Sequence, residues 1–172
     1  MTKKTDQKVR LIVRISTLCA LVSVVTIMAI PIPGPSGAYL NVGDAIVYTC
    51  AYMLGGFWGA LAAGIGSAAA DLILGSAIYA PATLIVKGLM AFVAGKIMAR
   101  GSGSFLNRMI AVAIGGAIMP AGYFLYESIL FGPALAAASV PFNLIQYAGG
   151  VALGLFLIQA IARILNRKGD DK

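Results

Sequence analysis

Positively charged residues in this 172-residue chain gather in three clusters, which long apolar runs separate. The connecting segments on the other side of these runs carry no Lys or Arg. This distribution follows the positive-inside rule, so the sequence predicts an integral membrane protein with both termini in the cytoplasm. The clusters are Lys3, Lys4, Lys8, Arg10 and Arg14; Lys96, Arg100 and Arg108; and Arg163, Arg167, Lys168 and Lys172.

The composition supports a membrane protein, because 60% of the residues are hydrophobic, only 11% are charged, and the mean hydropathy is +0.92. The length allows about six transmembrane helices. We therefore predict an all-α, multi-pass protein of the bacterial cell membrane, forming a single transmembrane domain over residues 1–172. The net charge of +7 reflects topology and contact with the lipid bilayer, with no nucleic-acid partner. The predicted spans are 11–30, 44–54, 60–78, 82–98, 105–130 and 141–163.

Several reaction classes lack the residues that they require. The chain contains no histidine, which removes His-based acid–base catalysis and most transition-metal sites. Its only Gly-Lys pair, Gly95-Lys96, is followed by Ile97 and has Met90 at the position of the first glycine of a phosphate-binding loop. The sequence therefore predicts no metal site, no catalytic residue and no ATP hydrolysis by this chain.

Four ionisable residues lie within the apolar runs: Asp44, Asp71, Lys87 and Glu127. Such groups are expensive at membrane depth, so each is a candidate for function. Structural explanations are open for three of them. Lys87 can pair with Asp71 to satisfy two buried charges, and Asp44 can cap the second span.

Polar and aromatic residues on spans two to six gather toward the outer half of the predicted bundle. Aromatic walls with a few aimed donors and acceptors are typical of a pocket for a small, flat, polar molecule. An outer aromatic belt is the alternative for the tyrosines, and we favour it for Tyr126. The predicted substrate-binding residues are Asn41, Asp44, Tyr48, Tyr79, Lys87, Tyr123, Glu127, Asn143 and Gln146.

The order of three segments resembles the substrate-binding S components of energy-coupling factor (ECF) vitamin transporters. The first segment is Tyr39-Leu40-Asn41-Val42-Gly43-Asp44, and the second is the Gly/Ala-rich stretch from Gly55 to Leu72. The third is Lys87-Gly88-Leu89 followed by Ala94-Gly95-Lys96. Together they span much of the chain, and their order and spacing are more specific than any one of them.

This resemblance implies a vitamin-binding subunit that works with a membrane coupling subunit (T component) and two ABC-type ATPases. ATP would be used by those partners, and this chain would need no cofactor. It also implies a docking face of small residues on the first helix, for which the candidates are Ser16, Ala20 and Ser23. Val24 departs from this pattern, because a third small residue would be expected there. Packing within the chain is an equally good explanation for each small residue taken singly. Within the family, the chain looks most like the branch linked to hydroxymethylpyrimidine or vitamin B6.

Two other functions are alternatives to that of an S component. One is a self-sufficient ion-coupled carrier that uses Asp71 and Lys87 as its relay. The other is an enzyme that works within the membrane through Asp44 and Asp71. The segment Asn41-Val42-Gly43-Asp44 lacks the first glycine of the intramembrane aspartyl protease signature, and Asp71 follows Ala70 rather than the expected tyrosine.

Overall fold

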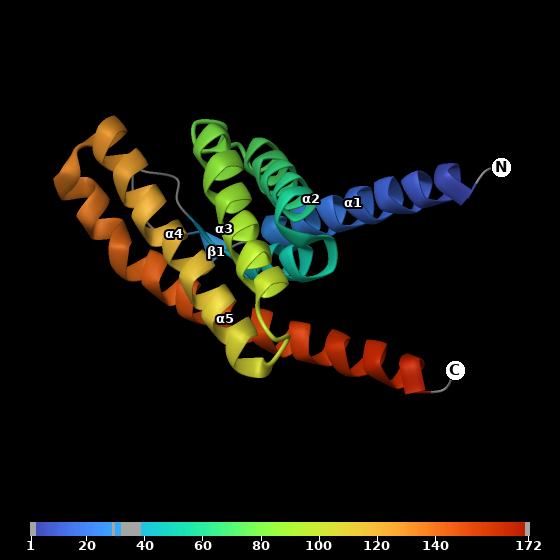
Figure 1. The fold of residues 1–172 in the computed structure, drawn as a ribbon. Coiled ribbons are helices and arrows are strands. Elements are labelled where there is room, and N and C mark those ends of the chain that lie inside the picture. The colour runs from blue at the N-terminus through green and yellow to red at the C-terminus, as the bar shows by residue number, and fades with distance from the viewer. Residues whose placement is uncertain (1–2, 29, 32–38, 171–172) are drawn as a thin grey trace.

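Helices make up nearly all of the protein, as the sequence predicts. The structure, a computed structural model, describes residues 3–28, 30–31 and 39–170. Five helices in this part of the chain are long and apolar enough to cross a membrane. The elements are α1 (Lys3–Ile27), β1 (Ile30–Pro31), β2 (Tyr39–Leu40), α2 (Asp44–Ile73), α3 (Ala80–Arg100), α4 (Phe105–Phe131) and α5 (Pro133–Asp170) (Figure 1).

The prediction of six transmembrane helices is not confirmed, because predicted spans two and three both lie in α2. The backbone of α2 is non-helical at Gly55, where φ is 76°. A Cβ added to Gly59 would lie 2.8 Å from the carbonyl oxygen of Cys50, so the two legs of α2 fold back against each other at Gly55. The first leg, residues 44–54, rises only about 16 Å, which is short of a hydrocarbon core of about 30 Å.

The start of α5 also differs from the prediction. We expected residues 133–140 to connect two spans and the last span to begin near Pro141, but α5 begins at Pro133 and Pro141 lies inside it. Proline is tolerated in the first turn of a helix, and the alanine-rich segment 134–138 that follows has high helix propensity. The last helix is therefore longer than the apolar pattern alone indicates.

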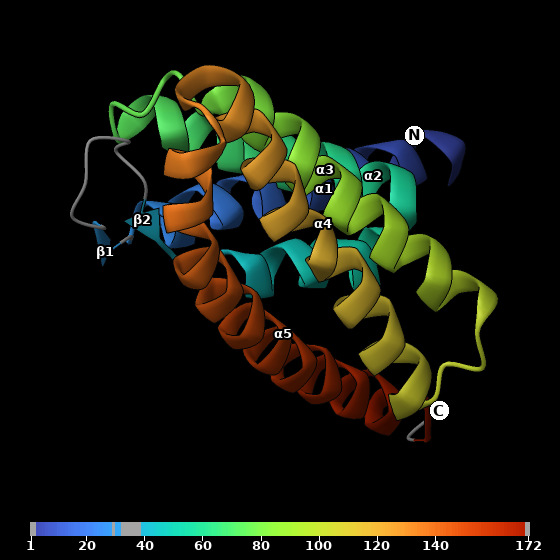
Figure 2. The same ribbon diagram turned by 90° about the vertical axis from the view of Figure 1, so that its left-hand side faces the viewer.

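The two ends of the bundle differ in character (Figure 2). The start of α1, the connection between α3 and α4, and the end of α5 lie on the right in that view. We call this the basic end, because it carries the clusters that include Lys96, Arg100, Arg108 and Arg163. The opposite end, here the strand end, carries β1 and β2, which pair antiparallel with Ile30 opposite Leu40. Residues 32–38 of the predicted outer loop lie outside the described residues.

Glycines allow the helices to approach closely. A Cβ at Gly66 on α2 would lie 2.5 Å from the carbonyl oxygen of Cys19 on α1. A Cβ at Gly95 on α3 would lie 2.6 Å from the backbone nitrogen of Gly56 on α2. Backbones meet at these points with no room for a side chain, which is typical of helix contacts in membranes. This packing holds α2 and α3 at the distance that the site requires.

Candidate functional site

A buried ion pair lies between the first leg of α2 and α3. The exposed fractions are only 1% for Asp44 and 2% for Lys87. Lys87 Nζ donates a hydrogen bond to Asp44 Oδ1 and lies 3.2 Å from Met119 Sδ on α4. Each charge offsets part of the cost of burying the other, so replacing one residue alone would leave an uncompensated buried charge.

Both structural explanations that the sequence left open for this pair need correction. We predicted Asp71 as the structural partner of Lys87, whereas the structure shows Asp44 in that role; Asp71 is buried on the second leg of α2. The cap position of α2 is Gly43, and Asp44 is the first residue of the helix. The Asp44 carboxylate therefore faces the other helices and does not cap its own.

Gln146 on α5 connects the ion pair to the strand end. Its Nε2 donates to Asp44 Oδ2 at 3.0 Å and lies 3.3 Å from Met119 Sδ. Its Oε1 accepts a hydrogen bond of 3.1 Å from the backbone N–H of Asn41. This contact depends on Gly150, because a Cβ there would lie 2.8 Å from Asp44 Cβ. A glycine one helical turn after Gln146 thus lets α5 come close enough to bond with α2.

Aromatic residues extend the network across α3 and α4. Lys87 Nζ lies 5.7 Å from the centroid of the Tyr123 ring, and the hydroxyl groups of Tyr123 and Thr83 are 2.9 Å apart. Tyr79 packs edge-on against Tyr123, with 6.3 Å between the ring centroids, and its hydroxyl donates to Glu127 Oε1 at 3.1 Å. A continuous polar and aromatic network therefore runs from Asn41 to Glu127.

Some buried polar atoms of this region have hydrogen-bonding capacity left. Tyr48 Oη and Glu127 Oε2 are buried and have no hydrogen-bond partner within the described residues. A groove of about 200 Å³ between the end of α1, β1, the start of α2 and α5 includes Asn41 and Gln146 in its lining. The region thus combines unused donors and acceptors, tyrosine rings and contact with the surface. The same described residues hold no group of three or more His, Cys, Asp or Glu side chains suited to a metal ion.

The structure brings most of the predicted site together. Seven of the predicted residues belong to the network, Tyr48 is buried beside it, and Asn143 is half-buried with no hydrogen bond within the described chain. Their contact with a substrate stays a prediction. Sequence reasoning missed Thr83 and Met119, although each lies one helical turn before a predicted residue on the same helix face. The seven are Asn41, Asp44, Tyr79, Lys87, Tyr123, Glu127 and Gln146.

The predicted docking residues on α1 divide into two kinds. Ser16 and Ala20 are exposed, one helical turn apart. Ser23 is half-buried, and its hydroxyl donates to the carbonyl oxygen of Gly66 at 2.7 Å. Packing within the chain, the alternative that the sequence left open, therefore accounts for Ser23 and leaves the other two available.

Comparison with known proteins relates most of the chain to one kind of membrane subunit. A family model described as ECF-type riboflavin transporter, S component, matches residues 6–163. The chain is 34% identical over 134 residues to an uncharacterized protein of Pyrococcus woesei, covering 77% of this chain and 88% of that protein. It is 27% identical over 139 residues to the thiamine precursor transporter HmpT of Lactococcus lactis subsp. cremoris, covering 81% and 76% respectively.

Two solved structures share the fold. One is the S component of a bacterial ECF transporter, with a TM-score of 0.70 and 19% identity over 92% of this chain and 98% of that chain. The other is the S component for biotin of an ECF-type ABC transporter, with a TM-score of 0.68 and 19% identity over 96% and 95%. At this level of identity the likeness concerns the fold alone.

The ion pair makes a prediction about stability. Lys87→Gln leaves the Asp44 carboxylate buried without its counter-charge, so we expect the free energy of unfolding to fall by about 3–5 kcal/mol. The double variant Asp44→Asn/Lys87→Gln removes the orphaned charge and should be more stable than Lys87→Gln alone. The measurement is denaturant unfolding in detergent micelles.

Lys96→Gln is the matched control, because Lys96 is an exposed lysine on the same helix. It should change the free energy of unfolding by no more than about 0.5 kcal/mol. Equal losses for the Lys87 and Lys96 variants would contradict the assigned role of the pair.

Proposed function

This chain belongs to the family of ECF-type riboflavin transporter S components, and on that premise we propose that it captures a small aromatic vitamin for an ATP-driven importer. The observation that carries this proposal is the buried network around Asp44, Lys87 and Gln146, in which α2, α3 and α5 meet. A structural ion pair alone does not require the tyrosines and the unused polar atoms that surround it. Those are the features of a site for a flat, polar ligand.

We propose that both termini lie in the cytoplasm and that the network lies in the outer half of the membrane. The start of α1 and the end of α5 lie at the same end of the bundle, the basic end (Figure 2). The reversal at Gly55 supports this arrangement, because it returns the chain to the side from which α2 began. Lys87 lies about 10 Å along α3 from its first residue, away from the basic end. By the positive-inside rule the basic end faces the cytoplasm, so the network lies toward the outer side of the membrane.

The substrate that we propose is a hydroxymethylpyrimidine or a pyridoxine-like form of vitamin B6. Both are single aromatic nitrogen rings with hydroxymethyl groups. Tyr79 and Tyr123 would contact the ring, while Glu127, Gln146 and Asn143 would bond to its polar edge. The similarity to a thiamine precursor transporter supports this choice. Riboflavin is the second candidate, which the description of the matching family model favours.

ECF S components work with an energy-coupling module made of a T component and ATPases. We propose that this chain does the same, that ATP is used only by those partners, and that the chain itself binds no cofactor. The alternative of an ion-coupled carrier would use Asp71 and Lys87 as its relay, whereas Lys87 is bonded to Asp44.

The substrate site is tested by titrating the purified chain in detergent with hydroxymethylpyrimidine, pyridoxine and riboflavin, using calorimetry. Replacing Gln146, Glu127 or Asn143 with alanine removes a polar partner of the ligand, so we expect each change to weaken binding of the pyrimidine or pyridine about tenfold. Gln7→Ala, at an exposed position near the start of α1, is the control and should bind as the parent does.

Unchanged affinity for every vitamin in all three alanine variants would place the site elsewhere. Tight binding of riboflavin alone would leave the site in place and replace the proposed substrate with the second candidate.

The docking face on α1 is tested by Ala20→Trp, which places a large ring where small residues would let the coupling subunit approach. We expect co-purification with the coupling subunit and ATPases to fall about tenfold, with vitamin binding unchanged. Leu21→Trp, an exposed position on the adjacent face of α1, is the control. If the two variants assemble equally well, Ala20 is not part of the docking face.

A further inference from the structure

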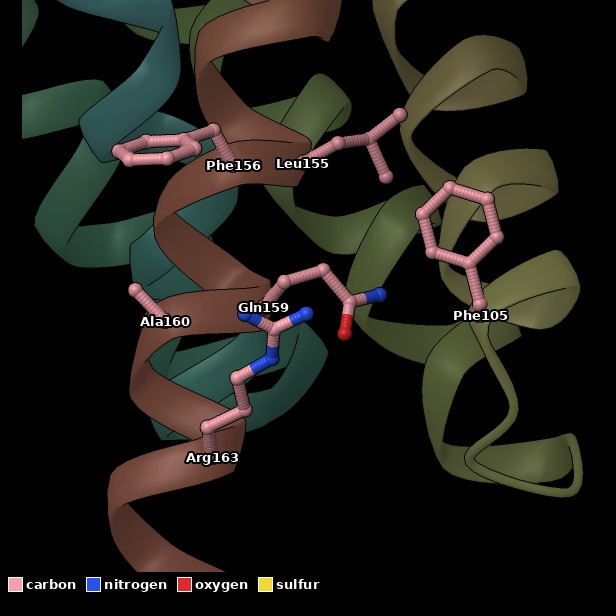
Figure 3. A pocket seen from close by; sticks show the side chains of 6 residues that line it. All are labelled: Phe105, Leu155, Phe156, Gln159, Ala160 and Arg163. Atoms are coloured by element: carbon pink, nitrogen blue, oxygen red, sulfur yellow. The ribbon is translucent and has the colours of Figure 1, made fainter.

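A second groove lies at the basic end, between α4 and α5, far along both helices from the network. It has a volume of about 270 Å³ and is open to the surface. Its lining combines aromatic and aliphatic side chains with a polar and basic edge (Figure 3). The aromatic part continues onto the outer surface of the bundle, where Phe105 and Phe156 are 56% and 69% exposed. The lining residues are Phe105, Leu155, Phe156, Gln159, Ala160 and Arg163.

Two buried donors, one on Gln159 at the polar edge and one on Arg108, to which Gln159 is bonded, have no acceptor within the described residues. Arg108 Nη1 donates to Gln159 Oε1 at 3.0 Å, which directs the other atom of that amide away from Arg108. Gln159 Nε2 and Arg108 Nε are both buried without a hydrogen-bond partner in this part of the chain. In Figure 3 the amide nitrogen of Gln159 points toward the space between Leu155 and Phe105. Buried donors of this kind are costly unless something else supplies the acceptor.

The arginines near this edge have no carboxylate partner within the part of the chain that the structure describes. Arg163 lies one helical turn after Gln159 on α5, and its side chain rises toward Gln159 (Figure 3). Arg108 lies over the Tyr52 ring, 5.4 Å from its centroid. Within the described residues the only salt bridge is that of Asp44 and Lys87, so neither arginine is paired with a carboxylate. An anionic ligand in the groove would meet the Arg163 guanidinium and the Gln159 amide, and the charge of Arg108, which is bonded to Gln159, lies close by.

We propose that this groove binds an anionic phospholipid. Its headgroup phosphate would accept hydrogen bonds from Arg163 and Gln159, and its glycerol and first acyl carbons would lie against Phe105, Leu155 and Phe156. The aromatic half of the groove favours a lipid over a free anion, because it opens onto the surface that faces the bilayer. Basic pockets between transmembrane helices at one membrane surface bind such headgroups. This site is separate from the proposed vitamin site and does not depend on it.

The test is native mass spectrometry of the full chain, released from detergent that contains either phosphatidylglycerol or phosphatidylcholine. We expect one phosphatidylglycerol to be retained in preference to phosphatidylcholine. Arg163→Gln removes one charge from the mouth of the groove and should weaken retention about fivefold. Arg163 is exposed, so this change should not prevent folding. Arg100→Gln, at an exposed arginine of the same end outside the groove, is the control and should retain the lipid as the parent does.

Three results would overturn this assignment. Equal retention of both lipids would show that no anion is recognised. If the Arg163 and Arg100 variants lose phosphatidylglycerol equally, its retention would reflect general attraction of an anionic lipid to a basic surface and not binding in the groove. Thermal stabilisation by inorganic phosphate as strong as that by phosphatidylglycerol would make the groove a site for a free anion.

Discussion

The ion pair between Asp44 and Lys87 is the interaction on which the arrangement of the helices depends. An isolated charge of either sign in the membrane interior costs roughly 2.5–3.5 kcal/mol or more. The two residues must therefore lie at the same depth and face each other, which sets the start of α2 against the second and third turns of α3. Gln146 fixes α5 in the same arrangement, because its amide nitrogen donates to Oδ2 of Asp44. Three helices thus converge on one carboxylate.

Close backbone contact makes this convergence possible. Helices in a bilayer gain little from the hydrophobic effect between them, so small residues and interhelical hydrogen bonds hold them together. Gly55 adopts a positive φ that other residues rarely take, and the reversal there gives α2 a short first leg. That leg carries Asp44 and Tyr48 into the interior, where both are buried. Gly150 then leaves room for α5 beside Asp44.

The sequence predicted the membrane location, the basic end and most members of the network, because charges within apolar runs are conspicuous. It named Asp71 as the partner of Lys87, whereas the structure has Asp44 in that place. Asp44 and Asp71 lie on two legs of one folded helix, both legs pack against α3, and nothing in the apolar pattern says which carboxylate reaches Lys87. Met119 was not predicted, because a methionine within an apolar run cannot be distinguished from other apolar residues by the sequence pattern. Phe131-Gly132-Pro133 was expected to begin a connection that lasts to Pro141, but Pro133 suits the first turn of a helix and Pro141 lies within α5.

Binding of a vitamin by the network is tested most directly by mass spectrometry of the small molecules that co-purify with the chain when it is expressed alone and extracted in detergent. We predict a pyrimidine or pyridine vitamin at about one molecule per chain, since an S component must hold its substrate without help from the ATPases. A chain that carries no vitamin, and that no vitamin protects from thermal unfolding, would contradict the claim.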